Sequence, residues 1–166
     1  MKLRLEKATN ADSEVIFDMQ VKAFMPLLEK YKDTATSPAN EPIDNVIKRI
    51  NYSTGGFYKI LHDDILLGAI CIYWKEETQF WISPMFILPE YQGMGIAQEA
   101  IQIIESQFPQ ATTWELRTIL EEKRNCHLYE KMGYSLTGET KRLNENMTLV
   151  SYKKFVKSYE TTACIS

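Results

Sequence analysis

The sequence has few of the residues that mark metal sites, disulfide-linked folds or membrane segments. Its 166 residues include two histidines and three cysteines, and neither group has the spacing of a metal-binding cluster. Cys71, Cys126 and Cys164 cannot all pair, so we expect reduced thiols. Apolar runs such as 65–73 are too short to span a bilayer, and the N-terminus reaches Glu6 too early for a secretory signal. We therefore expect a cytoplasmic protein with no metal and no membrane partner.

The chain also lacks a surplus of basic residues. Lys and Arg together number 19 against 22 for Asp and Glu, which gives a net charge of -3. A sequence-independent nucleic-acid binder normally has a basic surplus, so no nucleic-acid partner is expected. What is present is the balance of a folded domain, with 45% hydrophobic and 25% charged residues. The length fits one domain over residues 1–156, followed by a C-terminal tail over 157–166.

Hydrophobic periodicity predicts an alternation of helices and strands in the order β-α-α-β-β-β-α-β-α-β-β. Three consecutive antiparallel strands followed by strand-helix-strand indicate an α/β (α+β mixed) fold with helices on both faces of a central sheet. Thr9 and Asp12 resemble a capping box before the first helix, which Pro26 is expected to kink or end, and residues 30–42 have the composition of a loop. The later helices are expected near 46–50, 96–108 and 123–132, and the strands near 3–5, 57–61, 65–74, 79–88, 112–119, 134–143 and 147–155.

The most informative segment is 87–97, where a predicted strand leads through Gly93 and Gly95 into an amphipathic helix. The first turn of a helix has unpaired amides at the positive end of the dipole, and glycines let the backbone approach a phosphate closely. The segment therefore favours a pyrophosphate site at the amides of 92–97, although glycines at such a turn more often serve packing. No Lys-Ser/Thr of a P-loop follows, and no repeated βαβ unit opens here, so a dinucleotide-binding fold fits poorly.

Two segments together resemble the GCN5-related N-acetyltransferase (GNAT) family. The run Gln-Gly-Met-Gly-Ile-Ala over 92–97 is similar to that family's coenzyme A signature. Residues 125–134 are similar to its second motif, which ends in Tyr-x-Lys-x-Gly-aromatic. The element order agrees as well, including a mostly antiparallel sheet. The resemblance implies an N-acetyltransferase that passes acetyl from acetyl-CoA directly to a primary amine of a small molecule or peptide.

The resemblance also implies a role for individual residues. Free backbone groups of Met85, Phe86 and Ile87 would bind the pantetheine arm of the coenzyme. Asn125 and Tyr129 are four residues apart and share a helix face, so Asn125 would contact that arm and the Tyr129 hydroxyl would protonate the departing thiolate. The alternative for Tyr129 is a core aromatic residue. The amides that would hold the pyrophosphate are those of Gln92, Gly93, Met94, Gly95, Ile96 and Ala97.

The acceptor side leaves more alternatives open. The strand over 79–86 lacks the Glu that family members often place there, so the general base would be Glu76, Glu77 or a chain of waters. Acidic and aromatic residues in the first half of the chain would suit a cationic amine such as a polyamine or an aminoglycoside. They could equally form a solvated acidic loop, because lysines interleave with them. These residues are Glu29, Asp33, Glu41 and Asp44, with Tyr31, Trp74 and Trp81.

Other functions compete with the enzyme. Cys126 and His127 are adjacent on a predicted helix and point about 100° apart, so they are a poor nucleophile-base pair. The missing strand carboxylate favours a non-catalytic acetyl-CoA-binding regulatory or scaffold module as the main alternative. A nucleotide-phosphate binder of another class is a third hypothesis. By family analogy a homodimer through the last strands is expected.

Overall fold

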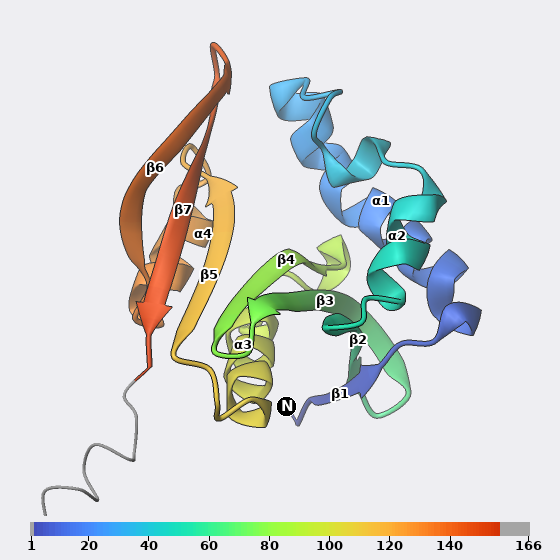
Figure 1. Cartoon of the computed structure of the whole chain (residues 1–166). Coiled ribbons are helices and arrows are strands. Elements are labelled where there is room, and N and C mark those ends of the chain that lie inside the picture. The colour runs from blue at the N-terminus through green and yellow to red at the C-terminus, as the bar shows by residue number, and fades with distance from the viewer. Residues whose placement is uncertain (1, 157–166) are drawn as a thin grey trace, which may run out of the picture.

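Seven strands form one mixed sheet in the order β1-β2-β3-β4-β5-β7-β6 in the computed structural model, which describes residues 2–156 (Figure 1). All neighbours are antiparallel except β4 and β5, which are parallel. The predicted tail over 157–166, including Cys164, lies outside the described residues. The strands are β1 Arg4–Lys7, β2 Gly55–His62, β3 Ile65–Glu76, β4 Gln79–Ile87, β5 Thr113–Ile119, β6 Ser135–Asn144 and β7 Met147–Phe155.

Helices cover both faces of this sheet, and two separate hydrophobic clusters hold them there. Successive side chains of a strand point to opposite faces. On β3, Ala69 and Cys71 therefore pack with α1 and α2, whereas Ile70 and Ile72 pack with α3 and α4. The predicted fold class and element order are confirmed. The α-helices are α1 Ser13–Tyr31, α2 Ile43–Ile50, α3 Ile96–Gln107 and α4 Lys123–Lys131, with short 3-10 turns at Asn10–Asp12, Pro38–Asn40 and Pro89–Tyr91.

The first helix is longer than its sequence predicts. The expected capping box is present, with the Thr9 backbone N–H donating to the Asp12 carboxylate over 2.8 Å. Pro26 lies inside α1 and does not end it; the helix continues to Tyr31, so the loop begins two residues later than predicted. The last turn is held from outside, because the Asn144 side chain donates to the Tyr31 carbonyl over 2.9 Å. Such tertiary contacts are not visible in local sequence.

Strands β4 and β5 pair over only part of their length. Their four paired positions run from Gln79–Thr113 to Ile82–Leu116, and no further pair follows. Beyond Ile82, β4 continues to pair with β3 as far as Ile87, while β5 continues to pair with β7. In Figure 1 the second half of β5 leans away from β4. The backbone of β4 from residue 83 onward therefore has no strand partner on its β5 side.

The outer strand β6 is exposed along most of its length and has β7 as its one strand neighbour in the described sheet. The homodimer through the last strands stays a prediction. Within residues 2–156, no helix is long and apolar enough to cross a membrane, and no three His, Cys, Asp or Glu side chains gather as a metal site would require.

Candidate active site

A cavity of about 540 Å³ lies beside the free half of β4. Its wall comes from four parts of the chain: the end of β4, the glycine-rich turn before α3, the inner face of α4 and the second half of α1. All the residues predicted to bind the coenzyme line it except Met94, whose side chain is 55% exposed. Those that line it are Met85, Phe86, Ile87, Gln92, Gly93, Gly95, Ile96, Ala97, Asn125 and Tyr129.

The glycine-rich turn lines this cavity with the backbone that leads into α3. Gly93 and Gly95 both have φ near +80°, a region that other residues adopt at a cost. Gly95 is the residue before the first turn of α3, so the unpaired amides of that turn follow it directly. The Gln92 side chain turns back and donates to the Ile87 carbonyl over 3.0 Å, which ties the turn to the end of β4. The structure thus brings the predicted turn to the cavity wall, and its use as an anion site stays a prediction.

Arg124 is a residue of this cavity that the sequence does not reveal. Its guanidinium lies over the glycine-rich turn, so close that a Cβ added at Gly93 would meet Nη2 at 2.8 Å. None of the ion pairs within residues 2–156 includes Arg124. An unpaired cation beside unpaired amides strengthens the anion site.

A second cation, Lys30, lies on the opposite wall but is neutralised. Its ammonium is 2.8 Å from the Glu122 carboxylate, which also accepts a hydrogen bond from the Tyr31 hydroxyl. Burial acts to raise the pKa of Glu122, but Lys30 and Tyr31 outweigh it and hold that pKa below its ordinary value. These bonds join the end of α1 to the start of α4 at the cavity wall.

A smaller cavity of about 310 Å³ lies next to the larger one, lined in part by β4 and β5 where these strands diverge. It is walled by β4, by β5, by the segment after α1 and by the start of β7. The two cavities share part of their lining, so they meet inside the molecule. The shared residues are Phe24, Leu27, Met85, Asn125 and Tyr129.

Tyr129 is the titratable residue at this meeting point. Burial raises the pKa of its hydroxyl to about 12. Two neighbouring tyrosines pack on its ring, but their hydroxyls are already engaged: Tyr134 donates to Glu105 over 3.1 Å and Tyr152 to Glu130 over 2.7 Å. Neither neighbour lines either cavity, so Tyr129 is the one of these three tyrosines that lines both.

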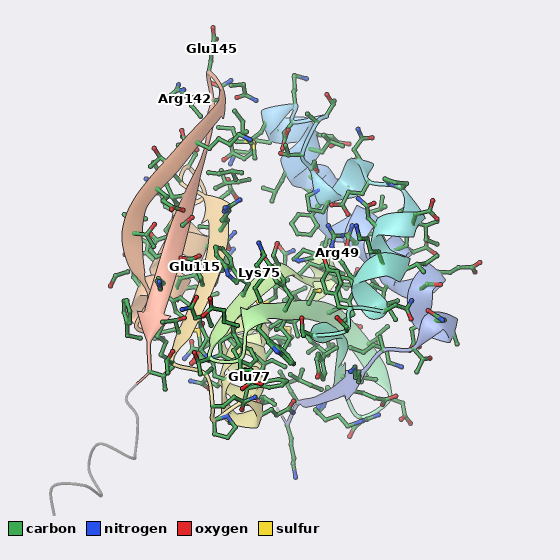
Figure 2. All side chains as sticks on the ribbon, viewed as in Figure 1. Arg49, Lys75, Glu77, Glu115, Arg142 and Glu145 are labelled. Carbon is green, nitrogen blue, oxygen red and sulfur yellow. The ribbon has the colours of Figure 1, made fainter. Side chains whose placement is uncertain are left out.

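The two carboxylates considered as a base lie away from both cavities. Glu76 and Glu77 are exposed at the turn between β3 and β4, at the opposite end of β4 from the divergence. Figure 2 shows Glu77 at the lower end of the sheet. Neither residue lines a cavity.

The acidic and aromatic residues of the first half do not gather around an acceptor. Glu41 accepts two hydrogen bonds from Arg49, at 2.6 and 2.8 Å. Trp74 packs with Phe80 on the α3 side of the sheet. Of the four carboxylates, Asp33 alone lines the smaller cavity.

Cys126 and His127 also stay outside both cavities. Cys126 is buried, and its thiol donates to the carbonyls of Ile119 and Leu120, both at 3.7 Å. His127 is exposed on the next position of α4. The two point in different directions, as adjacent helical residues must.

Comparison with known proteins agrees with this geometry. The sequence matches the model of the acetyltransferase (GNAT) family over residues 22–134. A protein of Bacillus subtilis (strain 168), uncharacterized protein YrkN, is 30% identical over 139 residues, which are 81% of this chain and 74% of that protein.

Solved structures of N-acetyltransferases share the fold. The ribosomal-protein-S18-alanine N-acetyltransferase of Escherichia coli superposes with a TM-score of 0.75 at 8% identity, over 94% of this chain and 95% of that one. The spermidine N-acetyltransferase of Vibrio cholerae, solved with CoA and spermine, superposes with a TM-score of 0.74 at 16% identity, over 95% and 98%. These two act on different amines, so the shared fold does not name an acceptor.

Proposed function

Because the chain belongs to the acetyltransferase (GNAT) family, we propose that it transfers the acetyl group of acetyl-CoA directly to a primary amine of a small molecule or peptide. The observation that carries this proposal is the meeting of two cavities at Tyr129, where β4 and β5 diverge. One cavity suits a long phosphorylated donor and the other a smaller acceptor. Both volumes lie within the range of ligand sites, and a shared wall brings two reactants together.

The larger cavity has the groups that the coenzyme requires. The backbone of Met85, Phe86 and Ile87 is free on the side facing β5, so it can bond the amides of the pantetheine arm as a strand would. The amides at the start of α3 and the guanidinium of Arg124 suit the pyrophosphate. Asn125 stands between the two cavities and supplies an amide to the arm near its thiol end.

Acetyl-CoA supplies an acetyl group already activated as a thioester. As the amine nitrogen bonds to the carbonyl carbon, the C–S bond breaks and its electron pair goes to sulfur. Tyr129 stays protonated at neutral pH because burial raises its pKa to about 12, so its O–H can donate to that sulfur. An ordinary thiol has a pKa near 8.5, well below this value, so complete transfer of the phenolic proton is uphill. Tyr129 acts chiefly by stabilising the leaving sulfur with a hydrogen bond.

The acceptor amine must be neutral when it attacks. An alkyl amine with a pKa near 10.4 is neutral in roughly one molecule in a few thousand at pH 7. Asp33, the carboxylate of the smaller cavity, accepts hydrogen bonds from the Thr36 N–H and hydroxyl. We assign no side-chain base, and the amine proton passes to water. The value of kcat/KM for the amine should therefore rise with pH as the neutral fraction grows.

The proposal is tested by measuring thiol release from acetyl-CoA with a panel of amines: polyamines, aminoglycosides, amino acids and peptide N-termini. Amine-dependent release, with mass spectrometry showing one added acetyl group, supports it. CoA binding by calorimetry without release for any amine would refute it in favour of the non-catalytic acetyl-CoA-binding module.

A further inference from the structure

The smaller cavity is lined by one negative and one positive side chain, and the two differ in their hydrogen-bond partners. Its charged lining residues are Asp33 and Arg117. Asp33 is buried, and both of its oxygens accept hydrogen bonds from Thr36, one from the backbone N–H over 3.0 Å and one from the hydroxyl. Asp33 therefore fixes the loop after α1, and Thr36 occupies one acceptor position on each of its two oxygens.

Arg117, the other charged residue of this cavity, is opposite to Asp33 in charge and in exposure. It is exposed and is the first residue of β5 beyond the last pair with β4, so it stands where the strands begin to separate. Its guanidinium carbon lies 5.6 Å from the centre of the Trp81 ring, and Trp81 stacks on Tyr73 with centres 6.1 Å apart and planes 5° apart. An aromatic support of this kind orients a guanidinium and leaves its N–H groups available.

No described carboxylate satisfies this cation. None of the ion pairs within residues 2–156 includes Arg117. The nearest acid along the strand is Glu115, two residues earlier on the same face, and it pairs in register with Lys153 of β7. Burial raises the pKa of Glu115, and Lys153 opposes that change more strongly than Arg117 does. Glu115 is thus influenced more by Lys153 than by Arg117, and Arg117 lines the cavity without an ion pair among the described residues.

We propose that Arg117 binds a carboxylate of the acceptor, so that the acceptor is an amine that also bears a carboxylate. The planar fork of a guanidinium matches a carboxylate in two parallel hydrogen bonds. The same cation repels a polyammonium chain, so it selects against polyamines. This inference rests on the proposed acetyl transfer. Two sources share the chemistry: the α-carboxylate of a free amino acid, and an acidic side chain near the N-terminus of a peptide.

The test compares acceptors that differ only in the carboxylate. Each amino acid is assayed against its carboxamide, and each peptide with an acidic second residue against the matching Gln or Asn peptide. We expect the wild type to favour the carboxylate member of one series by about 10- to 100-fold in kcat/KM, the worth of a charged hydrogen-bonded pair. Arg117→Ala should bring that ratio close to one, Arg117→Lys should keep part of it, and the KM for acetyl-CoA should not change.

The matched control is Lys141→Ala, which removes an exposed cation of β6 that lines neither cavity and does not act on Glu115. It should keep the carboxylate preference. Equal loss of activity on both members of a pair in Arg117→Ala would indicate a structural role and overturn the inference. So would a wild type that prefers the amides or polyamines. Turnover without a carboxylate preference refutes this inference alone, whereas absence of turnover with every amine refutes the proposed function.

A second measurement does not depend on turnover. Trp81 lies under the guanidinium, so its fluorescence should respond when an N-acetyl amino acid or N-acetyl acidic peptide, the product of the reaction, is titrated in. We expect a saturable change with the carboxylate product, a weaker one with its amide, and loss of the difference in Arg117→Ala. Identical titrations with carboxylate and amide, or no response to either, would overturn the inference.

Discussion

The hydroxyl of Tyr129 can be removed with little change of shape by the substitution Tyr129→Phe. The ring packs against Tyr134 and Tyr152, and these contacts do not involve its oxygen. If the hydroxyl donates to the leaving sulfur, its loss affects the transition state more than the bound substrates. One hydrogen-bond donor aimed at developing negative charge is worth about 10²-fold in kcat, or roughly 2.7 kcal/mol. We expect a loss of that size with CoA affinity preserved.

The assay is steady-state thiol release together with CoA binding by calorimetry. Tyr134→Phe is the matched control, because it removes the same group from a neighbouring ring whose hydroxyl binds Glu105 and lines no cavity. It should lower stability by about 1 kcal/mol and leave kcat within about twofold. Because the pKa of Tyr129 is about 12, the wild-type kcat should show no alkaline decline below about pH 10. An unchanged kcat in Tyr129→Phe, or a decline near pH 8 that this variant abolishes, would refute the reasoning.

Three further predictions concern the donor cavity and the framework. Arg124→Ala should weaken CoA binding about fivefold to tenfold in calorimetry but leave pantetheine binding unchanged, with the neighbouring Lys123→Ala as control; equal losses for both ligands would contradict a phosphate contact. Gly68→Ala should cost at least about 3 kcal/mol in urea unfolding, because its methyl would lie 2.1 Å from a carbonyl oxygen of β4; a cost under about 1 kcal/mol would contradict that geometry. Glu122→Gln should lower the free energy of unfolding at pH 7. Because the folded pKa of Glu122 is lowered, its contribution is present above the unfolded pKa of about 4.3 and is lost as pH falls through the folded pKa. The free energies of unfolding of the two proteins should therefore converge in acid, and a gap that stays constant with pH would contradict the ion pair with Lys30.

Local sequence predicts which donor-side residues line one cavity, because its signals are local; that they bind the coenzyme stays a prediction. The turn over 92–97 needs glycines for its backbone, and the four-residue spacing of Asn125 and Tyr129 needs only a helix. The geometry of both features is determined by residues that are close together in the sequence. The order of strands follows in the same way from alternating side chains and turn residues.

The charged groups of the site depend instead on contacts between distant segments. Alternation along β5 puts Glu115 and Arg117 on one face, but the divergence of β4 decides that Arg117 borders a cavity. Arg124 precedes the predicted Asn125, yet only the packing of α4 brings its side chain over Gly93. The sequence therefore identifies charged residues that could belong to the site, but only the tertiary structure shows which of them have no ion-pair partner.

The acidic loop after α1 illustrates why composition misleads about the acceptor. Gln20 is fully buried and donates from Nε2 to the Pro38 carbonyl and to Glu41, both at 2.9 Å, while Arg49 holds Glu41 from the other side. A buried network of this kind is costly to break and fixes one conformation of the loop. The Glu41 carboxylate therefore stabilises the loop conformation through its bonds to Gln20 and Arg49. A ligand entering the smaller cavity would meet the fixed loop after α1 on one side and the exposed guanidinium of Arg117 on the other. Under the proposed function we therefore expect charge selection to come from Arg117 rather than from the more acidic segment.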